Sequence, residues 1–68
     1  MTDLKATMYK TARVVDRNVP IPDGFEPGDY VGVKYLRVGS FGERLFECTR
    51  ADGTVAAIGE YSLENFCL

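Results

Sequence analysis

"EPGDYVGVKY", residues 26–35, is the stretch that decides the fold. Pro27-Gly28 suits the two central positions of a type II turn, because proline presets φ and glycine supplies the positive φ that the second position needs. An alternating run follows, whose side chains point in turn to the two faces of a strand. One face carries Val31, Val33 and Tyr35, and the other carries Tyr30, Gly32, Lys34 and Leu36. The stretch therefore predicts an abrupt reversal of the chain directly into a strand.

Strand-type sequence recurs on both sides of this run. Residues 6–16 are rich in Thr, Tyr and Val, which favours an early strand. Residues 44–50 and 55–59 predict two more strands, and Asp52-Gly53 between them is a strong hairpin signal. Four strands are thus predicted before residue 60.

The segment between the first two strands, residues 18–29, has an irregular composition. It holds all three prolines of the chain and two glycines, so a regular ladder of hydrogen bonds cannot form there. It is nevertheless too apolar for a disordered linker. We expect Val19, Ile21 and Phe25 to anchor this loop under the sheet.

The C-terminal stretch completes the predicted fold. Gly59 ends the fourth strand, and residues 60–66 are too short for a stable helix, so they predict one 3₁₀ turn before a last strand at residues 66–68. A chain of 68 residues has room for one domain, residues 1–68, with a single small core. The prediction is an all-β, strongly bent, five-stranded barrel.

This pattern resembles the SH3-like barrels. The stretch "GFEPGDYVGV" is similar to the glycine–aspartate lead-in to the second strand of that superfamily, and "AIGEYSLENFCL" is similar to its strand, 3₁₀ turn and terminal strand. The resemblance covers residues 20–68 and implies the same fold. Peptide-binding SH3 domains hold proline-rich ligands on an aromatic groove that includes a tryptophan. This chain has no tryptophan, so the resemblance does not extend to that ligand.

Composition and charge narrow the class of protein. No apolar run approaches the roughly 20 residues of a membrane span, and the N-terminus lacks the basic-then-apolar order of a signal peptide. We therefore expect a cytoplasmic protein with no membrane partner. Residues 1–17 carry four basic and two acidic residues, a net +2, whereas residues 18–68 carry four basic and eight acidic residues, a net −4. A nucleic-acid binder usually concentrates its basic residues more strongly.

The two cysteines, Cys48 and Cys67, are too few for the disulfide framework of small secreted domains. We expect two reduced, partly buried thiols. The alternative is a disulfide that fastens the C-terminus, which would need an oxidising compartment.

The chain has few of the residue types that commonly act as general bases or metal ligands. The chain has no histidine, which removes the commonest general base and most zinc sites, and two cysteines cannot fill a four-ligand zinc site. The close carboxylate pairs, Glu26 with Asp29, Glu43 with Glu47 and Glu60 with Glu64, are typical of a solvated surface. We therefore predict no enzyme, no cofactor and no metal.

The aromatic residues are the candidates for binding. Phe41 lies near the tip of the "GSFG" loop, where an exposed ring would anchor a partner and an inward ring would cap the barrel. The candidate partner-binding residues are Phe41, Tyr30, Tyr35, Tyr61 and Arg37. We predict a small non-enzymatic protein-binding module, which acts as an accessory or regulatory protein and whose size suits a phage- or plasmid-encoded inhibitor.

Two other functions stay open at this stage. In a nucleic-acid-binding barrel, Lys10, Arg13, Lys34 and Arg37 would cluster on one surface and the tyrosines would stack on bases. An enzyme site could instead be assembled across a homo-oligomer, as in the plasmid-borne type II dihydrofolate reductases, which this chain resembles in length and in its "GD-V" lead-in. Their Val-Gln-Ile-Tyr run corresponds here to residues 55–58, which lack the glutamine and the tyrosine. Open strand edges make a homo-oligomer plausible in either case.

Overall fold

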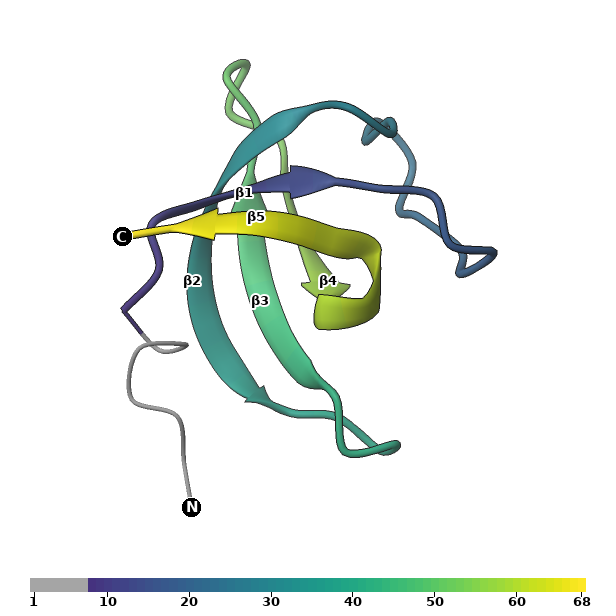
Figure 1. Cartoon of the computed structure of the whole chain (residues 1–68). Helices are drawn as coiled ribbons and strands as arrows, with labels where there is room; N and C mark the ends of the chain where they lie inside the picture. The colour runs from purple at the N-terminus through teal and green to yellow at the C-terminus, as the bar shows by residue number, and fades with distance from the viewer. Residues whose placement is uncertain (1–7) are drawn as a thin grey trace.

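Five antiparallel strands and one short 3₁₀ turn form the fold in the computed structural model, which describes residues 8–68 (Figure 1). The strands are β1 (Thr11–Val14), β2 (Tyr30–Val38), β3 (Arg44–Thr49), β4 (Val55–Gly59) and β5 (Leu63–Cys67), and the turn is η2 (Glu60–Ser62). The all-β class, the strand count and the 3₁₀ turn before the last strand are as predicted.

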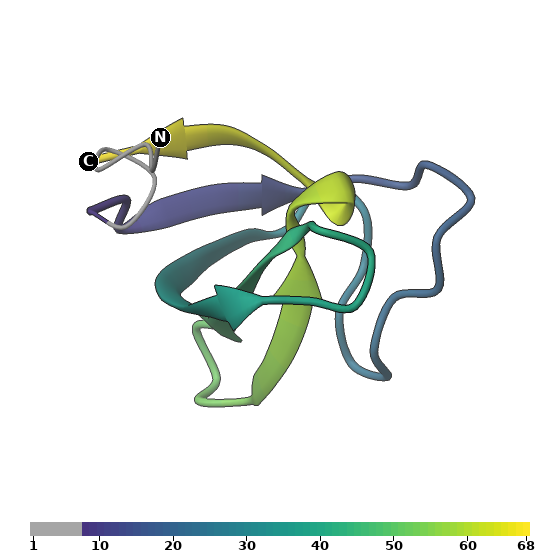
Figure 2. The ribbon, with the colours of Figure 1, turned by 90° about the horizontal axis from the view of Figure 1, so that it is seen from below.

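The strands form one curved sheet in the order β4-β3-β2-β1-β5. Every pair of neighbours is antiparallel. The sheet curls strongly but does not close within the described residues, so β4 and β5 are its two edges. Figure 2 shows these edges on opposite sides of the curl.

The turn before β2 has the predicted geometry. Gly28 has a φ of 97°, and the N–H of Asp29 donates to the carbonyl of Glu26 at 3.1 Å, which closes the turn around Pro27-Gly28. The Gly28 N–H also donates to the Val14 carbonyl at 2.7 Å. The turn is therefore bonded to the end of β1, which places β2 beside that strand.

The alternation in β2 is confirmed. Val31 and Val33 are buried and Tyr35 is half-buried on one face, whereas Tyr30 and Lys34 are exposed on the other. The register with β3 shifts between residues 35 and 37, which marks a bulge at residue 36. Bulges bend a strand locally, so this one increases the curl of the sheet near the tip of the β2–β3 hairpin.

The hairpin between β3 and β4 turns at Asp52-Gly53, as predicted. The Gly53 N–H donates to the Arg50 carbonyl, the Arg50 N–H donates to the Thr54 carbonyl, and Gly53 has a φ of 92°. This is a three-residue hairpin loop with glycine in the left-handed position. Asp52 Oδ1 accepts from the Thr54 N–H at 2.9 Å, and this hydrogen bond lowers the pKa of Asp52.

The N-terminal strand is shorter than predicted. β1 spans residues 11–14 of the expected 6–16, and residues 6 and 7 lie outside the described residues. Single hydrogen bonds continue past both ends, from the Lys10 N–H to the Cys67 carbonyl and from the Val15 N–H to the Ser62 carbonyl. Beyond the bond of Val15, Asn18 adopts a left-handed φ of 62°, which is outside the extended range of a strand.

The last strand is longer than predicted and contains a bulge. β5 begins at Leu63 rather than at residue 66, because η2 takes only the first three residues after Gly59. The register with β1 shifts opposite residues 11–13, and Asn65 sits in the bulge with a φ of 53°. The extra residue reverses the in–out alternation, so that Phe66 packs on the core face together with Leu63.

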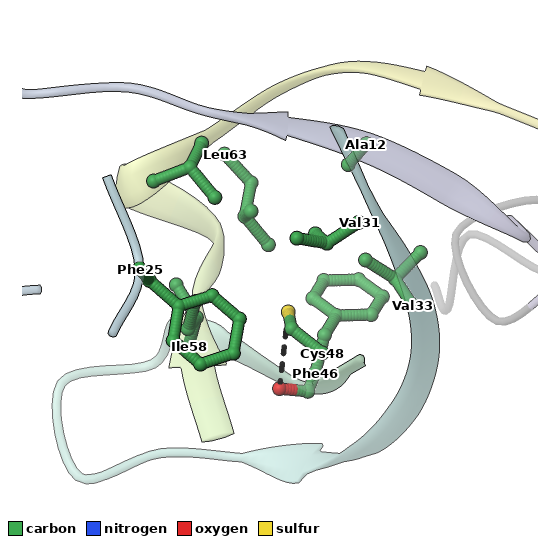
Figure 3. Packing of buried hydrophobic residues seen from close by; sticks show 9 residues of the cluster. Ala12, Phe25, Val31, Val33, Phe46, Cys48, Ile58 and Leu63 are labelled. Atoms are coloured by element: carbon green, nitrogen blue, oxygen red, sulfur yellow. Dashed lines mark hydrogen bonds between the residues drawn. The ribbon is translucent and has the colours of Figure 1, made fainter. Parts of the chain in front are cut away.

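The core lies inside the curl of the sheet (Figure 3). Phe46 at the centre of β3 is 1 % exposed and packs against the half-buried rings of Tyr35 and Phe66. Phe25 reaches the core from the β1–β2 loop. The buried cluster consists of Ala12, Val14, Phe25, Val31, Val33, Phe46, Cys48, Ile58 and Leu63.

The predicted loop anchors are confirmed in part. Phe25 is buried and Ile21 is half-buried against the core. The prediction for Val19 was wrong, because this side chain is 41 % exposed. The Asn18 N–H donates to Asp16 Oδ1 at 3.0 Å and forms a local turn directly before Val19.

Candidate functional site

The β2–β3 loop holds Phe41 outward on a fixed backbone. The Gly39 N–H donates to the Glu43 carbonyl at 2.6 Å, and the Gly42 N–H donates to the Gly39 carbonyl at 3.1 Å. The Phe41 N–H itself donates to Glu43 Oε1 at 3.1 Å. The Phe41 side chain is nevertheless 85 % exposed, so the open question of its direction is answered: the ring points to water and does not cap the core.

Glu43 is the residue around which this loop is organised. A Cβ added to Gly39 would collide with the Glu43 carboxylate, so the lack of a side chain at residue 39 makes room for that carboxylate. The Glu43 Cγ lies 3.5 Å from where a Cβ on Gly59 would stand. Glu43 therefore fills the space between the loop and the end of β4.

An ion pair links the β2–β3 hairpin to η2. Glu60 Oε2 accepts from the backbone N–H of Arg44 at 2.6 Å and from Arg44 Nε at 3.1 Å, while Oε1 accepts from Nη2 at 3.1 Å. The side-chain hydrogen bonds from Arg44 lower the pKa of Glu60, and partial burial opposes them. The bidentate geometry fixes the direction of η2 relative to the loop that carries Phe41.

Tyr61 follows Glu60 in η2 and is 52 % exposed. Its carbonyl accepts from Arg17 Nη1 at 3.5 Å, and Arg17 Nη2 also lies 3.5 Å from Glu64 Oε1. The turn that carries Tyr61 is thus held by Arg44 from the hairpin and by Arg17 from the β1–β2 loop. We name the surface formed by residues 39–43, η2 and residues 15–17 the aromatic end; its three segments lie at the same side of the molecule (Figures 1 and 2).

The five predicted binding residues do not all lie at the same place in the structure. Phe41 and Tyr61 share the aromatic end, and exposed Arg37 lies near the tip of the same hairpin. Tyr35 is half-buried, and its ring meets that of Phe46 edge-on with centroids 5.9 Å apart, so it belongs to the packing of the core. Tyr30 is 69 % exposed but lies at the other end of β2.

Two of the four cations that a nucleic-acid site would use lie beside carboxylates. Arg13 Nη1 lies 3.0 Å from Glu64 Oε2, and Lys34 stands directly opposite Glu47 across β2 and β3. Lys10 precedes β1, whereas Arg37 lies near the hairpin tip. Much of the positive charge is therefore offset by adjacent carboxylates.

Sequence reasoning missed two residues of the aromatic end, Glu43 and Glu60, and also Arg44 at the start of β3, which binds Glu60. The two glutamates were assigned to a solvated surface, but each is only half exposed and accepts hydrogen bonds. Arg44 and Glu60 are 16 residues apart in the chain, so no local spacing signals their pairing. The glycines at 39 and 42 were the available hint that the loop has a defined shape.

The two thiols differ strongly. Cys48 is fully buried, and burial, with a smaller effect of the Glu47 charge, raises its pKa to about 12. Both cysteines are free, but the expectation that both are partly buried was wrong, because Cys67 is exposed. The bulge at Asn65 turns residue 66, not residue 67, toward the core. Among residues 8–68, no three His, Cys, Asp or Glu side chains are grouped to hold a metal ion.

No family model, no curated protein and no solved structure matches this chain. Within the described residues, no helix is long and apolar enough to cross a membrane. The surface chemistry of the chain itself is therefore what links this fold to a function.

Proposed function

We propose that this chain is a small, non-enzymatic protein-binding module that acts as an accessory or regulatory protein and docks through the aromatic end. The observation that carries the proposal is the Phe41 ring, 85 % exposed on a loop whose backbone is closed by hydrogen bonds. Aromatic side chains are enriched at protein interfaces, and a few side chains that become buried at the centre of an interface supply most of its binding energy. A ring on a preorganised loop also loses little conformational entropy on docking.

The assignment of this all-β fold to the SH3-like barrels is part of this proposal. It is supported by the strand order β4-β3-β2-β1-β5, the long β1–β2 loop and the 3₁₀ turn between β4 and β5. A barrel of this size has a core filled by side chains, so its loops and edges are its working surfaces. The aromatic end is formed by such loops.

The charge around the aromatic end indicates the chemistry of the partner. Asp16 is exposed within the aromatic end, and the β1–β2 loop beyond it also carries exposed Asp23 and Glu26. The neighbouring cation Arg17 is engaged by Glu64. We therefore propose a partner surface with an apolar pocket for Phe41 and a basic rim, since complementary charges steer association and favour the right partner.

A capture experiment with matched variants tests this function. The tagged chain, the Phe41→Ala variant and the Tyr30→Ala variant are used to capture proteins from a lysate of the source cell, with and without nuclease, and the captured proteins are identified by mass spectrometry. Tyr30 is the control because its ring is comparably exposed at the other end of β2.

The expected result is one stoichiometric partner that survives nuclease, persists with Tyr30→Ala and is lost with Phe41→Ala. A partner that Phe41→Ala captures as well as the wild type contradicts docking through the aromatic end. Loss of all captured material on nuclease treatment favours the nucleic-acid alternative.

A further inference from the structure

The two edges of the sheet differ in how well they are protected from other strands. β5 contains the bulge at Asn65 and the charged Glu64, which interrupt a regular edge. β4, with the sequence VAAIG, has no charged residue, no proline and no bulge in its register with β3. Native proteins protect exposed edges with these devices, so their absence marks β4 as an edge that is able to pair.

The free hydrogen-bonding groups of β4 follow from the hairpin. In an antiparallel ladder, residue pairs alternate between bonded and non-bonded. The Arg50 N–H donates to the Thr54 carbonyl, so the alternation leaves Val55, Ala57 and Gly59 in the non-bonded positions. Their backbone N–H and C=O groups point away from β3. Gly59 is also the N-cap of η2, so the outward groups of Val55 and Ala57 and the Gly59 N–H are the ones left for another strand.

We propose that β4 pairs with β4 of a second copy of this chain, antiparallel and with the two-fold axis at Ala57. In this register Ala57 faces its own copy and Val55 faces Gly59, so the outward backbone groups of the two Ala57 residues bond to each other and each Val55 carbonyl accepts from the Gly59 N–H of the other copy. The result is one continuous sheet through two copies. This inference goes beyond the proposed function and does not depend on it.

The side chains of this register are self-complementary. Val55 is 53 % exposed and would lie over Gly59 of the other copy, next to Leu45, whose Cδ2 is 3.6 Å from where a Cβ on Gly59 would stand. No charged residue lies within β4, so no like charges face each other across the seam. The Glu47 side chains of the two copies are separated by three strand spacings, about 14 Å, beyond the screening length of roughly 8–10 Å.

Pairing of β4 with β4 gives a closed dimer and not a filament of many copies. Pairing β4 with β5 would repeat without closing and would form a filament, whereas pairing β4 with itself closes at two. The bulge in β5 disfavours the first arrangement. Each chain therefore has one unprotected edge, β4. Two such edges pair with each other and leave none open for a third copy.

Sedimentation equilibrium over a range of protein concentrations tests the pairing. The wild type is expected to pass from 7.6 kDa to twice that mass as concentration rises. Ala57→Pro removes the outward N–H without removing a bond to β3, and is expected to stay monomeric with an unchanged circular dichroism spectrum. Ala57→Val is the control at the same position, because it keeps the N–H and the dimer. A wild type that is monomeric up to about 1 mM would overturn the proposal, as would a dimer that Ala57→Pro leaves intact.

Cross-linking tests the register directly, even if the proline variant does not fold. In a Cys67→Ser background, Ala57→Cys places two thiols at the two-fold axis, where a short bismaleimide is expected to give a covalent dimer. Thr49→Cys in the same background is the control, since residue 49 is exposed but lies one strand in from the edge. Equal cross-linking of both variants, or none with Ala57→Cys, would overturn the register.

Discussion

The backbone N–H and the guanidinium of Arg44 both donate to the carboxylate of Glu60, across 16 residues of sequence. This one contact joins the start of β3 to the start of η2. Two exposed aromatic residues flank this contact in the chain: Phe41 lies three residues before Arg44, and Tyr61 directly follows Glu60. The relative placement of these two rings therefore depends on this ion pair.

Replacing Glu60 with Gln is expected to destabilise the fold by about 1 kcal/mol at pH 7, because it removes the charge from a partly exposed bidentate pair. The pKa of Glu60 is lower in the folded state than its ordinary value. Its contribution is therefore present above the unfolded-state pKa of about 4.3 and is lost as pH falls through the folded-state pKa. Urea unfolding at pH 7 and at pH 3 measures the difference, which should shrink at pH 3.

The matched control for this variant is Glu26→Gln. Glu26 is an exposed glutamate of the β1–β2 loop, and its change is expected to lie within about 0.5 kcal/mol of the wild type at both pH values. A Glu60→Gln variant as stable as the Glu26→Gln variant at pH 7 contradicts the role given to the ion pair.

Replacing Gly39 with Ala is expected to loosen the loop that presents Phe41. The added methyl group would displace the Glu43 carboxylate, which accepts from the Phe41 N–H. Hydrogen exchange followed by NMR should show faster exchange at the Phe41 amide and unchanged exchange at the amides of Phe46 and Cys48 in β3. Glu43→Gln keeps an acceptor oxygen and should retain the slow exchange at Phe41; unchanged exchange in Gly39→Ala would show that the bond to Glu43 does not protect this amide.

Local chemistry made much of the fold predictable. The Pro27-Gly28 turn and the Asp52-Gly53 hairpin follow from backbone preferences of a few adjacent residues, and the alternation of β2 follows from a period of two. The exposed position of Phe41 was left open, because a loop sequence does not state on which side of its backbone a ring will lie. The contacts that hold η2 join distant residues, Arg44 with Glu60 across 16 positions and Arg17 with Tyr61 across 44, as Arg13 and Glu64 also do across 51. No short-range pattern encodes such pairs.

The thiols are expected to react at very different rates. At pH 8 a thiol with a pKa of about 12 is ionised in about one molecule in ten thousand, and Cys48 is also shielded by the core. Cys67 is exposed. Titration with a chromogenic disulfide reagent should detect one thiol per native chain and two after unfolding in guanidinium, and Cys67→Ser should abolish the native reaction. Rapid native reaction of both thiols is the outcome incompatible with the packing around Cys48.

The bulge in β5 depends on a left-handed backbone at Asn65, which is the feature that turns Phe66 into the core. Asparagine tolerates this conformation better than other residues with a Cβ, and glycine adopts it without steric cost. The free energy of unfolding, measured with urea, is therefore expected to be about 1 kcal/mol lower for Asn65→Ala than for Asn65→Gly. Both variants lack the exposed asparagine amide, so the comparison reports on the backbone. If the bulge instead relaxed, Phe66 would leave the rings of Tyr9 and Phe46, which lie 4.9 and 5.2 Å from it between centroids. Asn65→Ala would then lose several kcal/mol, as large core truncations do. Equal stability of the two variants would show that residue 65 does not need the left-handed conformation.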